Sequence, residues 1–345
     1  MASEDEYVAR AMRRLAEVLE TQLALVKPEA IARLSEAYTS DEKRNFDSHI
    51  VGLALQALQN NGTIVRRTAT SKGGHFIATY EPANQHKRTT DIAAAAARKR
   101  ALYSRYLGWA QGTKRYPEGM LGPAGEAATR AGILASAALQ PAQPGAGSVA
   151  SILGVTLPGP ADSAGYMNPI ISGIPQPPVT LIFEVKNIRE WIYPSSSEVF
   201  QVLEKGRVLQ HGCPTSPIVP ILICRAAHPT AFWMASQLGF LIIDMRAQFI
   251  GTRVDEEPFM EVRTELFFTD LYLGDGPSLR VRDRLAKHLP KTIHLVATEW
   301  AATTSSPMAD YFATLRSGKL PRNDRNQLME DLRQLNKARG KRGGW

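Results

Sequence analysis

Helical and strand-like patterns of apolar residues follow one another in the first part of the chain. Apolar positions recur at helical spacing over residues 4–38, where Pro28 opens a second helix, and again over residues 46–60. Two short runs with the composition of strands, 63–68 and 75–80, then lie on either side of a turn. The pattern therefore predicts a mainly helical region that ends in a β-hairpin.

Strand and helix patterns alternate in the second half of the chain. The strand-like segments are 179–187, 218–225 and 240–250, and the helical segments between them are 197–210 and 229–238. This alternation predicts an α/β fold, in which helices pack on a central mixed sheet. We expect four parts along the chain: a helical region (1–90), a basic connecting helix (91–118), an α/β core (119–300) and a basic helical tail (301–345).

Composition and charge narrow the class of protein. The 345 residues are 44% hydrophobic and 21% charged, which is ordinary globular usage, and no apolar run is long enough to span a bilayer. The acidic N-terminus lacks the apolar stretch of a signal peptide, and two cysteines exclude a disulfide scaffold. We expect a cytoplasmic protein that does not enter membranes.

The basic residues are unevenly distributed. The net charge is +8, and residues 83–116 carry eight Lys and Arg residues against one acid. Arg98, Lys99 and Arg100 are adjacent within this stretch, and residues 316–345 hold nine basic residues against three acids. Such clusters favour contacts with nucleic-acid phosphates. A solvated helix face and a frayed tail remain the alternative.

The order of helix, helix and hairpin over residues 28–82 resembles a winged helix-turn-helix. Arg66 and Arg67 lie in the first strand of the hairpin and Lys72 at its tip. The resemblance implies that the second helix of the pair enters a DNA groove and that the hairpin touches the backbone. An ordinary unit of helices packed on a hairpin is the alternative.

Acidic and basic residues sit within a segment that otherwise reads as a buried strand. Because side chains alternate along a strand, Glu184 and Lys186 share one face, while Phe183 and Val185 point to the other. Asp162 ends another strand-like run upstream, and Glu126 lies at the start of a helical segment. A carboxylate and an ammonium side by side on an apolar strand are an unusual placement.

This arrangement resembles the PD-(D/E)XK nuclease superfamily over residues 123–250. Glu184-Val185-Lys186 matches its Glu-x-Lys element, Asp162 takes the place of the motif Asp, and Gln201 lies on the next helix. One departure is that Ala161 separates Pro160 from Asp162, so the chain has no literal Pro-Asp pair. The resemblance implies a restriction-endonuclease-like core and a metal-dependent endonuclease.

The resemblance also implies a role for each residue. Mg²⁺, for which Mn²⁺ substitutes, would be held by Asp162, Glu184 and the Val185 carbonyl, because Mg²⁺ prefers oxygen ligands. Lys186 would orient or deprotonate the attacking water. The remaining candidates are Gln201 and Lys205, which would hold the scissile phosphate, and Glu126, which would bind a second ion or a metal-bound water.

Several alternatives remain open at this point. One is that Glu184 and Lys186 form a structural ion pair and that the protein is a DNA-binding regulator whose nuclease-like domain is catalytically silent. RNA is an alternative to DNA as substrate. Cutting both strands of a duplex requires two sites, which favours a homodimer, and partner proteins in a larger system are a further option.

Overall fold

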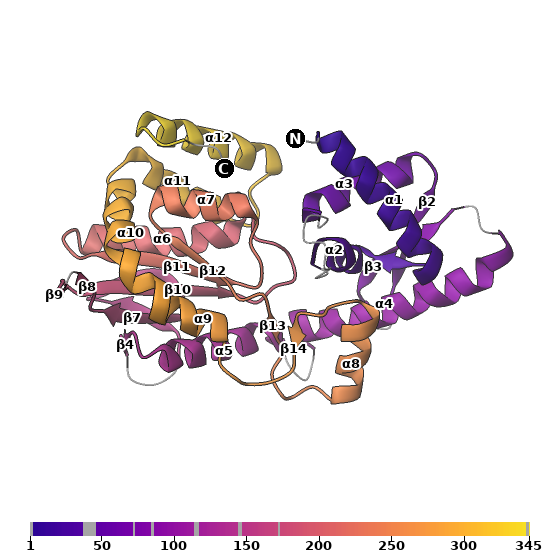
Figure 1. The fold of residues 1–345 in the computed structure, drawn as a ribbon, viewed down its shortest axis with the longest axis horizontal. Coiled ribbons are helices and arrows are strands. Elements are labelled where there is room, and N and C mark those ends of the chain that lie inside the picture. Colours follow the sequence, from indigo (N-terminus) through magenta and orange to yellow (C-terminus); the bar gives the residue numbers. More distant parts are fainter. Residues whose placement is uncertain are drawn as a thin grey trace. The chain divides into compact units, whose positions relative to one another are not determined.

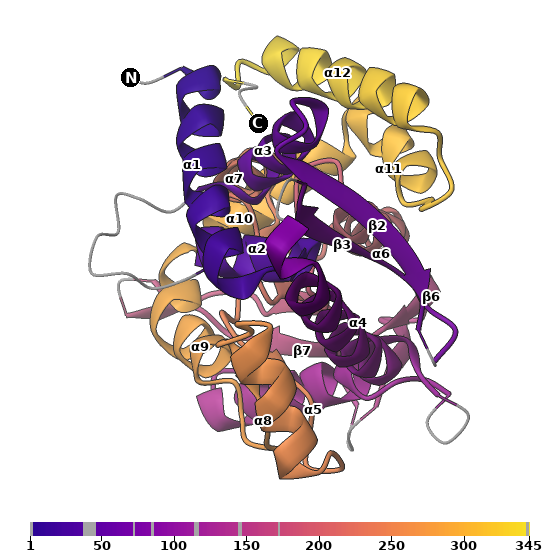
Figure 2. The same ribbon diagram turned by 90° about the vertical axis from the view of Figure 1, so that its right-hand side faces the viewer.

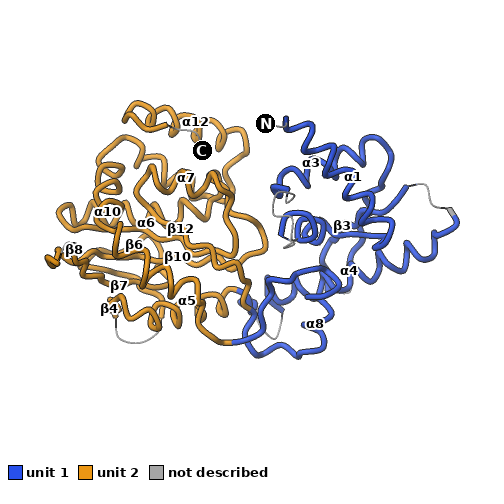
Figure 3. The backbone as a smooth tube through the Cα atoms, viewed as in Figure 1, with its two compact units in different colours: residues 1–121, 250–274 blue, residues 122–249, 275–345 orange. Residues whose placement is uncertain are grey.

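A computed structural model describes residues 3–36, 46–71, 73–83, 86–113, 117–143, 147–171, 173–342 and 345 (Figure 1). The chain forms two compact units (Figure 3). Unit 1 comprises residues 1–121 and 250–274, and unit 2 comprises 122–249 and 275–345. Residues 250–274, which the pattern placed in the α/β core, thus belong to unit 1. The connecting helix and the basic tail are parts of these units and not separate bodies.

Unit 1 combines helices with a small antiparallel sheet. Its elements are α1 (Glu4–Gln22), β1 (Leu25–Val26), α2 (Lys27–Ile31), a π-helical turn (Ala32–Glu36), α3 (Ser48–Asn60), β2 (Ile64–Thr70), β3 (Phe76–Pro82), a 3₁₀ turn (His86–Arg88), α4 (Thr89–Gln111), α8 (Glu256–Glu265) and β14 (Leu271–Tyr272). The sheet order is β1-β3-β2, and β3 packs beside α4 (Figure 2). The predicted helices and hairpin of this region are confirmed.

Local sequence explains where these helices begin and what they bury. At the start of α1, Ser3 and Glu6 form a capping box, in which each side chain accepts from the other residue's backbone N–H. Pro28 lies in the first turn of α2, where its missing N–H costs nothing. The apolar face of α1, which includes Leu15 and Leu19, packs within the same core as α3.

A buried ionic cluster joins three separate segments of unit 1. Glu29 of α2 is fully buried, and its Oε1 accepts from Lys99 Nζ of α4 at 2.7 Å and from Arg33 Nε at 2.9 Å. Lys99 also donates to the Glu265 carbonyl of α8 at 2.6 Å. Burial raises the pKa of Glu29, and the two cations oppose this effect. The cluster ties residues 250–274 to the N-terminal elements.

Unit 2 is built around a five-stranded mixed sheet. Its elements are α5 (Leu121–Ser136), β4 (Gln140–Pro141), β5 (Val149–Ile152), β6 (Val155–Ala161), β7 (Ser163–Met167), β8 (Ile170–Ile171), β9 (Ile174–Pro175), β10 (Val179–Lys186), α6 (Ser197–Gly212), β11 (Ile218–Cys224), α7 (Pro229–Leu238), β12 (Leu241–Asp244), β13 (Gln248–Phe249), α9 (Leu279–Asp283), a π-helical turn (Arg284–His288), α10 (Leu289–Thr304), a 3₁₀ turn (Pro307–Ala309), α11 (Asp310–Leu315) and α12 (Arg322–Ala338). The order is β12-β11-β10-β7-β4, with β10, β11 and β12 parallel and β7 antiparallel to β10. The predicted α/β fold with flanking helices is confirmed. The single strand expected over 240–250 is instead two, β12 and β13, because Arg246 between them has a positive φ of 52°.

The two faces of this sheet belong to two different cores. Ile182 of β10 lies in a core with α6, α7, α11 and α12, whereas Leu181, Phe183 and Val185 lie in a core with α5 and α9. Figure 1 shows these two groups of helices on opposite sides of the sheet. The strand is buried on both faces, as expected for a central strand with parallel neighbours. Glu184 shares the Ile182 face by the two-residue period.

The C-terminal segment packs on unit 2 through α11 and α12. Phe312, Met329 and Leu332 lie in the core beside α6. Arg339 and Lys341 both pair with Glu299, each at 2.6 Å. Among the described helices, none combines the length and apolar character that a membrane crossing needs.

The ionic cluster of unit 1 gives a prediction about stability. Replacing Lys99 by Met should destabilise the protein by about 3 to 5 kcal/mol, because it leaves the Glu29 carboxylate buried with less compensation. Urea unfolding at neutral pH measures the effect. Lys87→Met is the matched control, since Lys87 is exposed, and it should change stability by less than about 0.5 kcal/mol. Equal effects of the two substitutions would show that the cluster does not support unit 1.

Candidate active site

The candidate site lies in unit 2, where the central strand β10 ends. The parallel strands β10, β11 and β12 end together, with Lys186, Cys224 and Asp244 in register. Asp162 lies between β6 and β7, directly before the start of β7. Because β7 is antiparallel to β10, this position lies beside the end of β10. The Asp162 backbone N–H donates to the Phe183 carbonyl at 3.0 Å. The antiparallel pairing of β7 with β10 thus brings Asp162 beside the Glu-x-Lys element.

Two lysines hold the Glu184 carboxylate. The Glu184 side chain is 5% exposed, and its Oε1 accepts from Lys186 Nζ at 2.8 Å. Its Oε2 accepts from Lys205 Nζ of α6, and the same ammonium donates to the Pro160 carbonyl at 2.6 Å. The Lys186 side chain is 22% exposed and that of Lys205 is 10% exposed. Lys186 is therefore the more accessible of the two cations.

Burial and a neighbouring carboxylate both disfavour the ionised form of Asp162. Its Oδ2 accepts from the Val185 N–H at 2.6 Å, which fixes the carboxylate against the end of β10. Burial and then the neighbouring Glu184 raise the pKa of Asp162 to about 6; Glu126 adds to the rise, and the Val185 N–H and Lys186 oppose it. A cation bound between these carboxylates would relieve the repulsion.

Val185 lies between the two charged residues of the strand. Its side chain points into the opposite core, and its N–H is the donor to Asp162. The strand thus places a charged side chain, a core side chain and a second charged side chain in succession.

Glu126 approaches the site from α5. Its Oε2 accepts from Arg130 Nη1 at 3.3 Å, and the same nitrogen donates to the Asp162 carbonyl at 3.4 Å. Among the described residues, Glu126 does not complete a tight cluster of three carboxylates with Asp162 and Glu184. Its influence on Asp162 is therefore that of a neighbouring charge. The sequence patterns did not single out Arg130, although its place one helical turn after Glu126 could have indicated it.

A glycine allows α5 to come this close to the end of β10. A Cβ atom at Gly125 would lie 2.4 Å from the Asn187 Cβ, so only glycine fits without a shift of the backbone. Asn187 itself is fixed, since its amide donates to the Phe249 carbonyl at 2.6 Å and its Oδ1 accepts from the Phe249 N–H at 3.1 Å. This contact positions Glu126, the next residue of the helix.

Gln201 lies on the same helix as Lys205, one turn earlier. Residues four apart project from the same helix face, so Gln201 and Lys205 both lie on the side of α6 that faces the end of β10. Gln201 is half-buried. The structure therefore brings together Asp162, Glu184, Lys186 and Lys205, with Gln201 and Glu126 on the helices beside them.

The basic residues expected to bind nucleic acid on α4 have partners inside unit 1. Arg98 pairs with Glu261 at 2.8 Å and with Glu265 at 2.6 Å. Lys99 is buried and pairs with Glu29. The charges of Arg98 and Lys99 are thus compensated within unit 1, and phosphate binding by these two residues stays a prediction.

Arg100 and the basic residues of the hairpin differ in the partners that their side chains have inside unit 1. Arg100 donates to Thr79 Oγ1 at 2.9 Å and lies 3.8 Å from Glu81. Arg67 pairs with Glu81 at 3.2 Å while most of its side chain stays exposed. Arg66 is exposed on the hairpin, and Lys72 lies outside the described residues.

Cys224 and Asp244 lie at the ends of the neighbouring strands β11 and β12. Burial raises the pKa of the Cys224 thiol to about 12, and Asp244 adds to this rise, so Cys224 is not a thiolate at neutral pH. Asp244 pairs with Arg280 at 2.9 Å and with Arg246 at 3.0 Å.

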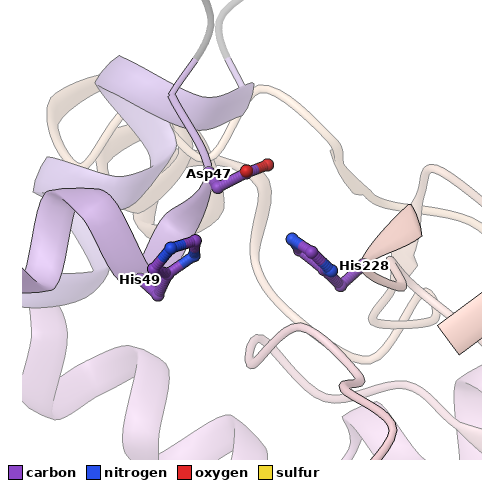
Figure 4. A group of neighbouring side chains, drawn as sticks. All are labelled: Asp47, His49 and His228. Carbon is purple, nitrogen blue, oxygen red and sulfur yellow. The ribbon is translucent and has the colours of Figure 1, made fainter. Parts of the chain in front are cut away.

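Figure 4 draws Asp47, His49 and His228, which carry metal-ligating groups. Asp47 and His49 stand at the start of α3 in unit 1, whereas His228 belongs to unit 2. There His228 caps α7 by accepting from the Thr230 N–H at 3.3 Å. Since the two units are not placed relative to one another, we build no metal site from these three residues.

Comparisons of the chain with protein-family models, with curated proteins and with solved structures gave no match.

The raised pKa of Asp162 gives a prediction about stability and pH. In the presence of EDTA at pH 8, Asp162→Asn should stabilise the protein by about 1 to 3 kcal/mol, because it removes a charge that folding disfavours. The gain should shrink as pH falls through 6, where folded Asp162 takes up a proton, and vanish below its ordinary value of 3.8. Urea unfolding at several pH values measures it.

The control is Asp324→Asn, at an exposed position in the first turn of α12. Loss of this favourable helix-dipole interaction should destabilise the protein by less than about 1 kcal/mol. A variant Asp162→Asn that is less stable than the native protein at pH 8 would show that folding does not disfavour ionised Asp162.

Proposed function

We propose that this chain is a metal-dependent nuclease with a restriction-endonuclease-like core, which hydrolyses phosphodiester bonds of DNA. The observation that carries the proposal is the pairing of Glu184 and Lys186 at the end of a central strand, with Asp162 bonded to the backbone between them. RNA stays an alternative substrate, since nothing in this site reads the sugar.

The residues of the site suit a hard divalent cation such as Mg²⁺ or Mn²⁺. Asp162 and Glu184 offer carboxylate oxygens, which these ions prefer, and one or two carboxylates are what a Mg²⁺ site commonly takes from the protein. Burial and then the neighbouring Glu184 raise the pKa of Asp162, and a cation bound beside it would favour its ionised form. When bound, the metal would neutralise the charge that develops on the phosphate.

We assign different roles to the two lysines that contact Glu184. Lys186 is the more exposed lysine on Glu184, so we assign it to hold and orient the attacking water. Lys205 is more buried and is fixed by the Pro160 carbonyl, so we assign it to position Glu184. Gln201 lies one turn away on the same helix and would contact the scissile phosphate.

The element order of unit 1 supports a winged helix-turn-helix as the DNA-binding part. Helices α1, α2 and α3 precede the β2–β3 hairpin, and β1 joins the sheet beside β3. Over α3, all of which is described, there is no Lys or Arg, so that helix brings neither of these side chains to a phosphate. One face of the hairpin instead carries exposed Arg66 and Thr68, and Phe76 is 80% exposed at its tip. We therefore propose the hairpin as the part of unit 1 that touches the backbone.

A second candidate function is DNA binding without catalysis. It is favoured by the two ammonium groups on Glu184, which already neutralise the carboxylate that a metal would use. In this case the site would be an internal ion-pair network. Nuclease activity requires that metal and substrate displace at least one of these contacts.

A homodimer also remains a proposal. The apolar face of α1 packs in the core of its own unit, and the segment after residue 300 does the same on unit 2. A dimer is therefore favoured by the need to cut two strands and by no residue of these helices.

Cleavage assays test the catalytic proposal. Supercoiled plasmid should be nicked with Mg²⁺ or Mn²⁺ and stay intact with EDTA, and Glu184→Gln or Lys186→Met should lower the rate at least about 100-fold. The controls Glu190→Gln and Lys291→Met, at exposed positions of the same unit, should cut as the native protein does. Cutting retained in both site variants would place the chemistry elsewhere. Binding without any cutting by the native protein would support the second candidate.

Salt-dependent binding tests the role of the hairpin. Arg66→Ala should weaken binding to duplexes of any sequence and reduce the slope of log affinity against log salt by about one, because one phosphate contact is lost. Fluorescence anisotropy in EDTA measures both quantities. Arg13→Ala, which removes an exposed arginine from α1, is the matched control. An unchanged slope in Arg66→Ala would move the DNA path away from the hairpin.

A further inference from the structure

A small cavity opens in unit 2 beside the candidate site. Its volume is about 160 Å³, and it lies among α5, the end of β4 and the start of β7. The edge of the sheet is uneven at this point, because β4 pairs with β7 only opposite Gly165 and Tyr166. The cavity occupies the place beyond the end of β4, next to Ser163.

Arg130 connects the cavity to the carboxylates. It lines the cavity, and its Nη1 donates both to the Asp162 carbonyl at 3.4 Å and to Glu126 Oε2 at 3.3 Å. Ser163, which also lines the cavity, directly follows Asp162 in the chain. A group bound in the cavity would therefore lie next to whatever is bound at the carboxylates.

The walls of the cavity are mainly apolar, with a few polar groups among them. Ile133, Leu134 and Pro141 contribute apolar surface, and Gln143 offers an amide that can both donate and accept.

The size and lining of the cavity select the kind of ligand. Pockets for drug-sized molecules span about 300–1,000 Å³, so this cavity suits a single ring system. A free phosphate ion is a poor match, because the lining cation, Arg130, already contacts a carboxylate. A planar heteroaromatic ring would stack on the apolar walls and bond its edge to the polar groups.

We propose that the cavity receives one unpaired nucleobase of the strand whose phosphate lies at the carboxylate site. The inference rests on the proposed nuclease function and extends it to a substrate class. A paired base cannot enter such a cavity without leaving the helix, so nucleic acids with an unpaired nucleotide at the site (single strands, flaps or bulges) are the favoured substrates.

Binding to matched bulged duplexes tests the proposal. Fluorescence anisotropy in EDTA compares a duplex that carries one extrahelical nucleotide with the same duplex in which that nucleotide is abasic. Both have the same backbone, so the difference reports the base alone. The native protein should bind the base-containing bulge about tenfold more tightly.

Substitutions at the cavity provide the second arm. Gly147 lines the cavity and is exposed. Apart from its chain neighbours, no atom of the described residues lies within 4 Å of the position that a Cβ would take there, so Gly147→Phe should narrow the cavity without disturbing the core. It should remove the preference for the base, and so should Gln143→Trp, a second variant at an exposed position. Leu295→Ala, at a leucine 62% exposed on α10, is the control and should keep the preference. Thermal unfolding verifies that each variant is folded.

The outcomes separate this proposal from the proposed function. Equal affinity for the two bulges, or a preference that survives in both Gly147→Phe and Gln143→Trp, overturns the base-binding cavity. A free deoxynucleoside monophosphate that competes with the base-containing bulge at micromolar concentration would show that the cavity binds free nucleotides. This result would also overturn the proposal that the cavity receives a base of the bound strand. With Mg²⁺ added, cutting without a base preference would overturn the proposal that the cavity binds a base and would still support the nuclease function. A base preference without any cutting would support the base-binding cavity and contradict the nuclease function.

Discussion

The burial of one carboxylate at the end of a central strand governs the arrangement of unit 2. Glu184 lies on a strand that is buried on both faces, and an uncompensated charge in that place would cost several kcal/mol. Ion pairs with Lys186 on the same strand and with Lys205 on α6 compensate this charge. Lys205 in turn bonds the Pro160 carbonyl, which fixes the end of β6 just before Asp162. One buried charge thus positions a helix, a strand and the second carboxylate.

The same arrangement has a cost that a purely structural role does not explain. Asp162 is held against Glu184 by its bond to the Val185 N–H, although the proximity of the two carboxylates disfavours the ionised form of Asp162. A fold selected only for stability would replace Asp162 by a neutral residue that keeps the same hydrogen bond. Strongly shifted pKa values are concentrated at functional sites. This cost supports the proposal of a functional site over an internal ion-pair network.

Much of this site followed from short-range rules, and the parts that did not follow depend on contacts distant in sequence. The two-residue period of a strand was enough to place Glu184 and Lys186 on one face. The roles of Arg98 and Lys99 could not be predicted in this way, because Glu265 is 167 residues beyond Arg98. Nor could the sequence pattern show that Lys205 reaches Glu184, since this depends on how α6 packs against β10. Local periodicity indicates which residues share a face, and tertiary packing decides which of them meet.

The compensation of charge also changes how the basic composition of the chain should be interpreted. A net charge of +8 suggests many cations for a polyanion, yet Arg98, Lys99 and Arg339 are engaged by carboxylates within their own units. An ion pair of this kind must be broken before its cation can bind a phosphate, and the loss of the pair offsets the energy of the phosphate interaction. In the proposed nuclease, the described exposed cations without such strong internal pairing would contribute most to phosphate binding, and the hairpin provides one in Arg66. The distribution of acidic partners, more than the number of lysines and arginines, therefore determines which cations of this chain remain accessible to a polyanion.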